Sequence, residues 1–285
     1  MPRPSTTAEQ TLTSRPAPAV EIRAFASHDD YAACVALQRE TWGATFSEHV
    51  PPAILKVTQR IGGVSAGAFD ASGRLVGFVF GMTGVERGRL VHWSDMLAVR
   101  PEYRDAGLGR RLKQYQRDVL LPLGVEVIYW TYDPLVARNA HLNINRLGAQ
   151  VTEYVEDMYG ADTDSVLHRG IGSDRFVVAW PIGGRALAEA PPALTLDPGD
   201  AERTPLFNPD APRRRPKPGA VLVARVARVE IPADIGAVQA ASLEVAAAWR
   251  ADTRAVLTGA LGAGYRVAGF VRTHAERCYY LLARS

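Results

Sequence analysis

The segment that decides the fold is Met96-Leu-Ala-Val-Arg-Pro-Glu-Tyr-Arg-Asp-Ala-Gly-Leu-Gly-Arg-Arg-Leu112. It begins with the apolar residues of a strand and leads into an amphipathic helix that we expect over residues 108–121. The turn between the two contains Gly107 and Gly109. Glycine permits unusual backbone dihedral angles and a close approach of a ligand, so the turn is suited to binding.

The start of this helix is a predicted anion site. The first N–H groups of a helix have no acceptors within the helix, and the helix dipole places partial positive charge there. A pyrophosphate would fit such a site. The simpler alternative is a glycine turn followed by a solvated basic helix face. The side chains that could add charge for a further phosphate are Arg104, Arg110, Arg111 and Lys113.

Two better-known phosphate loops are excluded. A dinucleotide-binding fold requires Gly-x-Gly-x-x-Gly directly after a strand and an acidic residue about 20 residues further on. Only Gly107-Leu-Gly109 is present here. A P-loop requires Gly-Lys-Ser or Gly-Lys-Thr, which this segment lacks.

The run Arg104-Asp-Ala-Gly107-Leu-Gly109 resembles the acyl-CoA-binding motif of the GNAT acetyltransferases, Gln/Arg-x-x-Gly-x-Gly/Ala. The preceding Leu97-Ala-Val99-Arg-Pro-Glu-Tyr also resembles the way in which that family leaves its fourth strand. The resemblance covers residues 21–182, a little over half of the chain. It implies an α/β (α+β) fold with a mixed, mostly antiparallel central sheet flanked by helices. It places the chain in a bacterial subgroup with a C-terminal extension.

The resemblance implies acetyl-CoA or another acyl-CoA as cosubstrate and no metal. In the family the fourth and fifth strands separate, and the acyl-pantetheine arm lies between them. By that likeness the fourth strand binds pantetheine through its backbone, and amides of the turn bind the pyrophosphate. The cofactor-binding residues implied are Leu97, Ala98, Val99, Arg104, Asp105, Ala106, Gly107, Leu108, Gly109 and Arg110, with Asn139 and Asn143 of the next helix.

A general base is needed, because the family transfers the acyl group by direct attack of an amine on the thioester. A partly desolvated carboxylate or His near the separated strands could accept the proton. Asp95 has the best position, His92 is the second candidate, and Asp133, at the end of the fifth strand, is the third. Structural roles compete, since a strand Asp often bonds neighbouring backbone and Asp-Pro often opens a turn.

The sequence departs from the family at the position of the acid that protonates the leaving thiolate. The family often uses a Tyr in the helix after the fifth strand, and the corresponding residue here is Ile144. Tyr159 or Tyr132 could replace it. Alternatively, no acid is needed, because a thiolate is a fair leaving group.

Three side chains are candidates for binding the acceptor. Trp130 and Tyr132 put aromatic bulk at the end of a strand beside the expected cleft, and Arg175 could bind a carboxylate with two N–H groups. A surface pair of Asp174 with Arg175 is the alternative. The surrounding pattern resembles relatives linked to N-acylated amino acids. This resemblance implies a small-molecule amine, such as an amino acid, as acceptor, with acetyl or succinyl as the acyl group.

Composition divides the chain into four parts. Residues 1–20 are Pro-rich without an apolar stretch, and we expect a disordered arm. Residues 21–182 hold the acyltransferase domain, and residues 183–219 form a Pro-rich linker. Residues 220–285 are too few for a comfortable core of their own, so we expect this extension to pack on the first domain. It should contain a strand, a helix over 234–261 and a hairpin.

Charge and cysteine content limit the expected partners and the expected location of the protein. The chain has 285 residues, of which 33 are basic and 30 acidic, and the resulting net charge of +3 does not suggest a nucleic-acid partner. The two cysteines lie far apart, so a disulfide framework is not expected and a cytoplasmic location is the simplest. No apolar run approaches the roughly 20 residues that span a membrane.

Three classes of function remain open at this point. The first is an N-acyltransferase that acts on a small amine or, if its acceptor groove is open, on a protein. The second is a regulatory protein that binds acyl-CoA without turnover, which the missing Tyr favours. The third is a nucleic-acid binder that uses the Arg213–Lys217 cluster, although charges among prolines usually belong to a solvated linker. Family members often dimerise, so a homodimer is an option whose interface no residue indicates.

Overall fold

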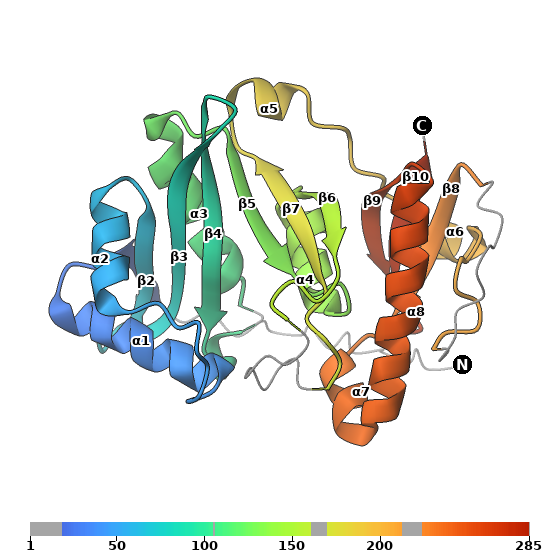
Figure 1. The fold of residues 1–285 in the computed structure, drawn as a ribbon, viewed down its shortest axis with the longest axis horizontal. Coiled ribbons are helices and arrows are strands. Elements are labelled where there is room, and N and C mark those ends of the chain that lie inside the picture. Colours follow the sequence, from blue (N-terminus) through green and yellow to red (C-terminus); the bar gives the residue numbers. More distant parts are fainter. Residues whose placement is uncertain (1–18, 105, 161–169, 213–223, 285) are drawn as a thin grey trace, which may run out of the picture.

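The structure is a computed structural model that describes residues 19–104, 106–160, 170–212 and 224–284 (Figure 1). The arm expected over residues 1–20 lies outside these ranges except for its last two residues. The Arg213–Lys217 cluster lies outside them entirely.

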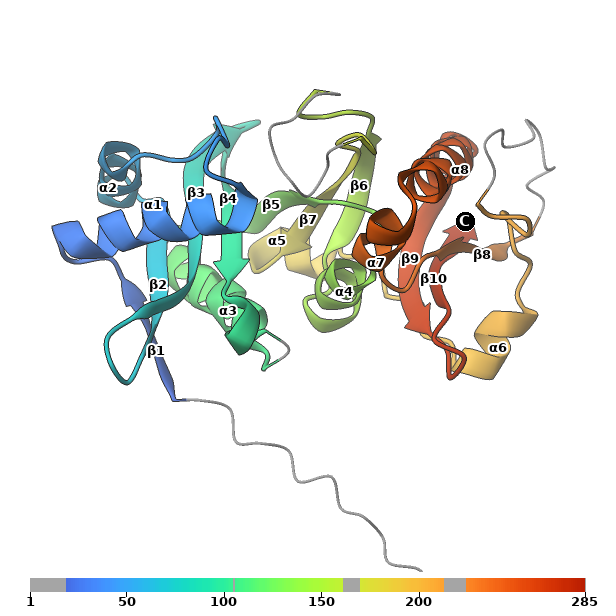
Figure 2. The ribbon, with the colours of Figure 1, turned by 90° about the horizontal axis from the view of Figure 1, so that it is seen from below.

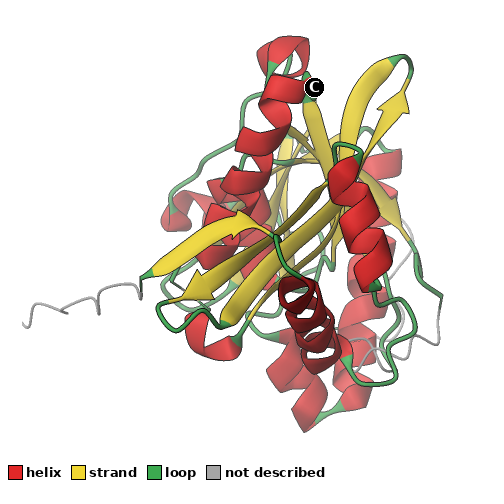
Figure 3. Ribbon diagram, turned by 90° about the vertical axis from the view of Figure 1, so that its left-hand side faces the viewer, coloured by secondary structure: helices red, strands yellow, loops and turns green. Residues whose placement is uncertain are grey.

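A twisted seven-stranded sheet forms the larger part of the fold (Figure 3). Its strands are β1 (Val20–Ala24), β2 (Val64–Asp70), β3 (Leu75–Glu86), β4 (Arg89–Val99), β5 (Val127–Tyr132), β6 (Gln150–Val155) and β7 (Arg175–Pro181). They occur in the order β1-β2-β3-β4-β5-β7-β6. Every neighbouring pair is antiparallel except β4 with β5. The mixed, mostly antiparallel sheet expected from the sequence is therefore confirmed.

Helices cover both faces of this sheet (Figure 2). On one face lie α1 (His28–Trp42) and α2 (Pro52–Arg60). On the other lie α3 (Leu108–Leu120), flanked by the short turns η1 (Pro101–Tyr103) and η2 (Leu121–Leu123), and then α4 (Ala137–Ala140) with η3 (His141–Arg146). The single helix expected here after β5 continues from α4 into η3 as a π-helix, a distortion that often occurs at functional sites.

Each face of the sheet has its own apolar core. Phe25, Leu37 and Phe78 are buried between the sheet and the α1–α2 layer. Leu112 of α3 and Ile128 of β5 are fully buried on the opposite face. Because the sheet is covered on both sides, β2 and the first half of β3 are buried continuously rather than at alternate residues.

A bulge in β4 changes which face its side chains occupy. Between the pairs Phe80–Met96 and Met82–Trp93, β4 has one residue more than β3. As a result Ser94 contacts α3, whereas Met96 joins the core beneath α1. The side chains on either side of the bulge therefore pack against helices on opposite faces of the sheet.

The C-terminal part forms a three-stranded antiparallel sheet beside the first (Figure 1). Its strands are β8 (Val226–Ile231), β9 (Tyr265–Arg272) and β10 (Cys278–Arg284), with β10 in the middle. α7 (Ile235–Ala241) and α8 (Leu243–Gly262) replace the single helix expected over 234–261. They are separate because Ser242 leaves the helical conformation and caps α8, its hydroxyl accepting the Val245 N–H.

The Pro-rich segment expected as a linker packs against this second sheet. It contains α5 (Gly184–Ala188) and α6 (Pro198–Arg203), and α6 lies on the side opposite α8 (Figure 2). The Leu194 N–H donates to the Ala268 carbonyl at 2.7 Å, and Ala201 is buried in a small core with Tyr279. Apolar residues between the prolines thus cover one face of the β8–β10–β9 sheet.

Polar and aromatic contacts join the two sheets. Tyr280 of β10 meets Phe176 of β7 edge-on at 5.4 Å, and its hydroxyl donates to the Pro134 carbonyl at 2.7 Å. Asn145 of η3 donates to the Phe270 carbonyl at 2.8 Å. The extension therefore contacts the first domain near the helix that follows β5.

Candidate active site

The parallel strands β4 and β5 are joined over a short stretch only. Their pairing runs from Val91–Val127 to Trp93–Tyr129 and then stops. Beyond this point the strands diverge (Figure 1), and the later residues of β4 pair with β3 alone. The other edge of β4 therefore has backbone groups without a strand partner in the described chain, which a ligand between the strands can bind.

The first turn of α3 lies at the open end of the separated strands. Gly107 caps the helix with φ 76°, in the left-handed region that glycine favours. A Cβ on Gly109 would lie 3.7 Å from the Leu97 side chain of β4 and 3.8 Å from the Leu142 side chain of η3. The first N–H groups of α3, which lack acceptors in the helix, are thus placed between β4 and η3.

The basic side chains expected around this turn have different surroundings. Arg104 Nε donates to the Val99 carbonyl at 3.0 Å and braces the turn against the end of β4. Arg111 donates to the Val20 carbonyl at 2.9 Å. Arg110 is exposed, as are Ala106 and Gly107, while Leu108 is buried, and Asp105 lies outside the described residues. Arg110 is therefore the side chain with most freedom to reach a phosphate.

Lys113 occupies the point at which β4 and β5 separate. Its side chain is buried, with 4% of the residue exposed, so the expectation that it adds charge at the phosphate site is wrong. Its Nζ donates to Ser94 Oγ at 2.7 Å and lies 3.7 Å from the centroid of the Trp130 ring. Ser94 and Trp130 are the first residues after the last β4–β5 pair. Lys113 follows Gly109 by one helical turn, which turns it toward the sheet.

His92 is completely buried behind this point. Its Nδ1 lies 3.0 Å from Thr83 Oγ1, and its Nε2 lies 2.9 Å from Gln116 Nε2. Since Thr83 Oγ1 donates to the Gly62 carbonyl, we assign the His92 proton to Nδ1, with Nε2 accepting from Gln116. Burial lowers the pKa of His92 to about 3, and the charge of Lys113 contributes. A buried, neutral ring of this kind is poorly suited to collect a proton from an ammonium substrate.

Asp95 lies in the β4 bulge and is exposed. Desolvation by the surrounding protein raises its pKa, and a hydrogen bond with Trp93 opposes that shift. The combination of an accessible carboxylate and a raised pKa is the one expected of a base beside the separated strands. Of the three base candidates, Asp95 is the one whose surroundings suit the role.

Tyr159 stands on the face of β5 and β7 that is turned away from α3. Its hydroxyl lies 3.0 Å from Thr131 Oγ1, and the Arg175 guanidinium lies 5.2 Å from its ring centroid. Arg175 is buried rather than part of a surface pair, and its Nη1 donates to the Asp174 carbonyl. Thr131 and Arg175 alternate along their strands with core residues such as Phe176, which places them on this face.

Asp133 is held in a buried ion pair. Its Oδ2 accepts from Arg250 Nη2 at 2.6 Å, and its Oδ1 accepts the Leu135 N–H at 2.8 Å. Burial alone would raise the pKa of Asp133, but the charge and hydrogen bond of Arg250 outweigh it, and the pKa is lowered. Because its carboxylate is already engaged, the geometry favours a structural role for Asp133 over that of a base.

Trp130 and Tyr132 face the core, because alternate residues of β5 point to the α3 side. Trp130 Nε1 donates to Asn143 Oδ1 at 3.2 Å, and Tyr132 packs edge-on against Phe176. The structure brings neither ring to an open surface. Asn143 is buried in η3 beside Trp130, whereas Asn139 is half-buried in α4.

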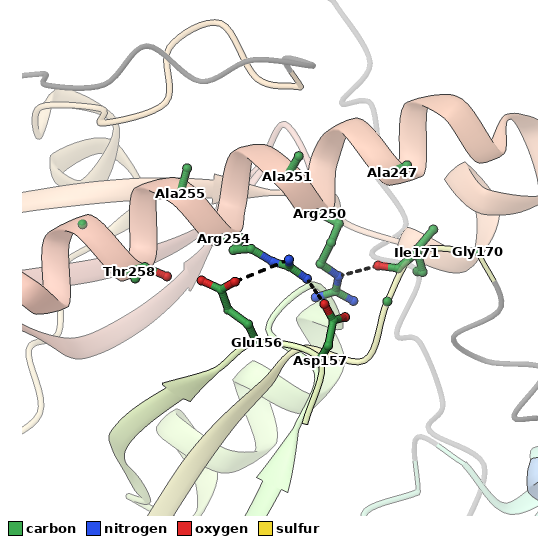
Figure 4. A pocket seen from close by; sticks show the side chains of 12 residues that line it. Glu156, Asp157, Gly170, Ile171, Ala247, Arg250, Ala251, Arg254, Ala255 and Thr258 are labelled. Carbon is green, nitrogen blue, oxygen red and sulfur yellow. Dashed lines mark hydrogen bonds and ion pairs between the residues drawn. The ribbon is translucent and has the colours of Figure 1, made fainter. Parts of the chain in front are cut away.

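Two arginines of α8 were not singled out from the sequence. Arg250 Nε donates to the Ile171 carbonyl at 3.1 Å, and Arg254 donates to Asp157 Oδ2 at 3.0 Å and to Asp174 Oδ2 at 2.8 Å. They line a shallow groove between α8 and the turn before β7 (Figure 4). Their spacing of one helical turn was the available signal, but it also fits a solvated helix face.

Comparison with known protein families identifies the class. The sequence model of the Acetyltransferase (GNAT) family matches residues 31–143, which include β4, the glycine turn, α3 and β5. This part of the chain is therefore similar to the GNAT acetyltransferases, in agreement with the expected family and enzyme class. No curated protein sequence matches the chain.

Three solved structures resemble part of the chain. The phosphinothricin acetyltransferase of Sinorhizobium meliloti, solved with acetyl-CoA, has 20% identity and a TM-score of 0.48, with 59% of this chain and 91% of that chain covered. The yncA protein of Salmonella typhimurium, solved with acetyl-CoA, has 18% identity and a TM-score of 0.46, with 59% and 96% covered. The ribosomal-protein-S18-alanine N-acetyltransferase of Escherichia coli has 20% identity and a TM-score of 0.44, with 59% and 97% covered.

The described residues form neither a metal site nor a membrane-spanning helix. They contain no group of three or more His, Cys, Asp or Glu side chains arranged to hold a metal ion. None of the helices in the described ranges is both long and apolar enough to cross a bilayer.

Proposed function

We propose that the protein is an acyl-CoA-dependent N-acyltransferase that moves an acetyl or succinyl group to the amine of a small molecule. The observation that carries this proposal is the early end of the β4–β5 pairing, with the first turn of α3 beside the open strands. A thioester arm needs hydrogen-bond partners along its length, and a pyrophosphate needs N–H donors. The two features offer these groups in one continuous arrangement.

The cosubstrate would be held mainly by backbone. The free edge of β4 from Leu97 to Val99 would bind the pantetheine arm. The amides that follow Gly107 would bind the pyrophosphate, with Arg110 free to contact a phosphate oxygen. Arg104 would act indirectly, because its side chain fixes the turn to the Val99 carbonyl.

The reaction would be a direct transfer. After the substrate ammonium has lost one proton, its nitrogen forms a bond to the thioester carbonyl carbon, the carbon–sulfur bond breaks, and the thiolate leaves with the electron pair. The nitrogen then loses a second proton as the amide forms, which balances the proton that the thiolate takes up. Asp95 would accept the proton that the substrate ammonium loses. Tyr159, whose hydroxyl is held by Thr131, would be the donor to the thiolate if an acid is used.

A free amino acid remains the acceptor that we propose. The support is Arg175, a guanidinium beside Tyr159 on the same face as Thr131, whose planar N–H groups suit a carboxylate. S. meliloti phosphinothricin acetyltransferase, by its name, acts on a small molecule, whereas the E. coli relative acts on a protein alanine. A peptide acceptor is therefore the alternative within this class.

An acyl-CoA-binding protein without turnover is the second candidate. The specific observation in its favour is Ile144, which occupies the position where the family often has a Tyr and is buried in the core. We further propose residues 21–182 as the acyltransferase domain and residues 220–285 as an extension that covers its β7–η3 side. A cytoplasmic location fits Cys34 and Cys278, which are both free thiols.

The test is calorimetric titration of acetyl-CoA and succinyl-CoA into the wild-type protein, Gly107→Glu and Gly124→Glu. Gly124 is the matched control, because it is also exposed, has φ 84° and has no atom within 4 Å of an added Cβ. Negative charge at Gly107 would face the pyrophosphate, so we expect a loss of affinity on the order of 100-fold there and little change at Gly124. Equal binding by both variants, or no binding by the folded wild type, would overturn the proposal.

A further inference from the structure

Lys113 is a buried basic side chain that the proposed mechanism does not use. An ammonium has three N–H donors. One goes to Ser94 Oγ, and the face of the Trp130 ring lies against the group at 3.7 Å. These two contacts come from the two strands that separate, so Lys113 Nζ marks the inner end of the space between them.

Lys113 has no acidic partner among the described residues. No Asp or Glu oxygen in the described ranges lies within 4.0 Å of its Nζ, and burial is the cause that lowers its pKa well below the usual lysine value. Besides Ser94, its polar neighbour is the neutral His92, whose Nε2 accepts from Gln116. Burial without an opposite charge favours the neutral amine, and an opposite charge beside it would favour the ammonium.

We propose that the acyl group transferred by this enzyme ends in a carboxylate, as a succinyl group does, and that this carboxylate pairs with Lys113 where β4 and β5 part. The inference rests on the proposed acyl-CoA site. A thioester lying between the strands, with its pyrophosphate at the start of α3, directs its acyl end toward the last β4–β5 pair. A carboxylate there would meet the unused N–H of Lys113.

The alternative roles of Lys113 fit the geometry less well. It does not reach the phosphate site, because it lies on the buried face of α3, one turn beyond Gly109. A purely structural role would be filled at lower cost by an apolar side chain of the same length, as at the neighbouring Leu112. A ligand that brings its own negative charge explains why a basic side chain is buried at this position.

The test compares succinyl-CoA with butyryl-CoA, which has the same number of acyl carbons but no carboxylate. Dissociation constants are measured by calorimetry for the wild type, Lys113→Met and Gln116→Met. Met preserves the length and apolar body of the lysine, and Gln116 is the control because it is buried on the same face of α3 and contacts His92 instead. We expect the wild type to prefer succinyl-CoA by about tenfold or more. Lys113→Met should lose that preference, and Gln116→Met should keep it.

A second readout needs no variant. Pairing with a carboxylate favours the protonated amine, so succinyl-CoA should bind with proton uptake, seen as a binding enthalpy that depends on the buffer's ionisation enthalpy. Butyryl-CoA should bind without it. Equal affinities for the two thioesters, or a succinyl preference that survives in Lys113→Met, would overturn the inference while leaving the acyl-CoA site intact. Failure of both thioesters and of acetyl-CoA to bind would remove the proposed function itself.

Discussion

Arg250 of α8 and Asp133 at the end of β5 form a buried ion pair that crosses between the two sheets, with 2.6 Å between Nη2 and Oδ2. Both residues are at most 5% exposed. Because Asp133 directly follows the strand that borders the proposed cofactor site, this pair fixes the end of β5 from the side of the C-terminal extension.

Breaking this pair should destabilise the whole protein. Arg250→Met removes the nearest cation from the buried Asp133 carboxylate and leaves Arg175 Nη1 at 4.0 Å, so we expect a loss of about 3 kcal/mol in the free energy of unfolding. The double variant Arg250→Met, Asp133→Asn removes both charges and should recover part of that loss. Urea unfolding at pH 7 measures both. A single variant as stable as the wild type would show that the pair contributes little.

The acid side of the stability profile should depend on His92. Its pKa is lowered to about 3 in the fold, so between the ordinary value of about 6.5 and pH 3 the unfolded chain binds a proton that the folded chain does not. Stability should therefore fall as pH falls through this window, by up to about 1.4 kcal/mol per pH unit. His92→Asn should flatten this slope relative to the wild type, whereas His28→Asn at an exposed site should leave it unchanged. An unaltered slope in His92→Asn would contradict the assignment.

Replacing Asp95 should reduce turnover without weakening cosubstrate binding. The raised pKa of Asp95 means that activity should decline as pH falls through a value above the ordinary one near 3.9, since the base must be ionised. Asp95→Asn should lower kcat by roughly 100-fold or more and remove this limb of the pH profile. Thiol release from acetyl-CoA with a panel of amino acids gives kcat, and calorimetry gives the affinity. Wild-type kcat in the variant would exclude Asp95 as the base.

Adjacent tyrosines of β10 should respond differently to loss of the hydroxyl. Tyr280 donates to the Pro134 carbonyl across the two sheets, and Tyr280→Phe should cost about 1–3 kcal/mol because that carbonyl stays buried. The Tyr279 hydroxyl is buried without a hydrogen-bond partner in the described chain, so Tyr279→Phe should be neutral or stabilising. Thermal melting of the two variants side by side is the measurement. A larger loss for Tyr279→Phe would contradict this account.

The glycine turn was the part of the site that the sequence made predictable. Gly107 and Gly109 act through backbone conformation and close approach, which residue identity alone determines. The strand–turn–helix order around them follows from local periodicity, and the structure reproduces it in β4 and α3.

Side-chain environments were less predictable, because they depend on distant contacts. The basic run after Gly109 predicts exposed charge, yet Lys113 faces the sheet and Arg111 binds β1. Asp133 looked like a free carboxylate, since its partner Arg250 is remote in the sequence.

The order of strands in the second sheet determines when this sheet can form during synthesis. β10 is the middle strand, yet it follows both β8 and β9 along the chain, so neither outer strand has its partner until β10 has been made. Tyr280, which contacts Phe176 and Pro134 of the first sheet region, belongs to β10 and is therefore also made last. A nascent chain stalled before β10 would therefore lack this cover on the β7–η3 side, making that side a target for chaperones and proteases.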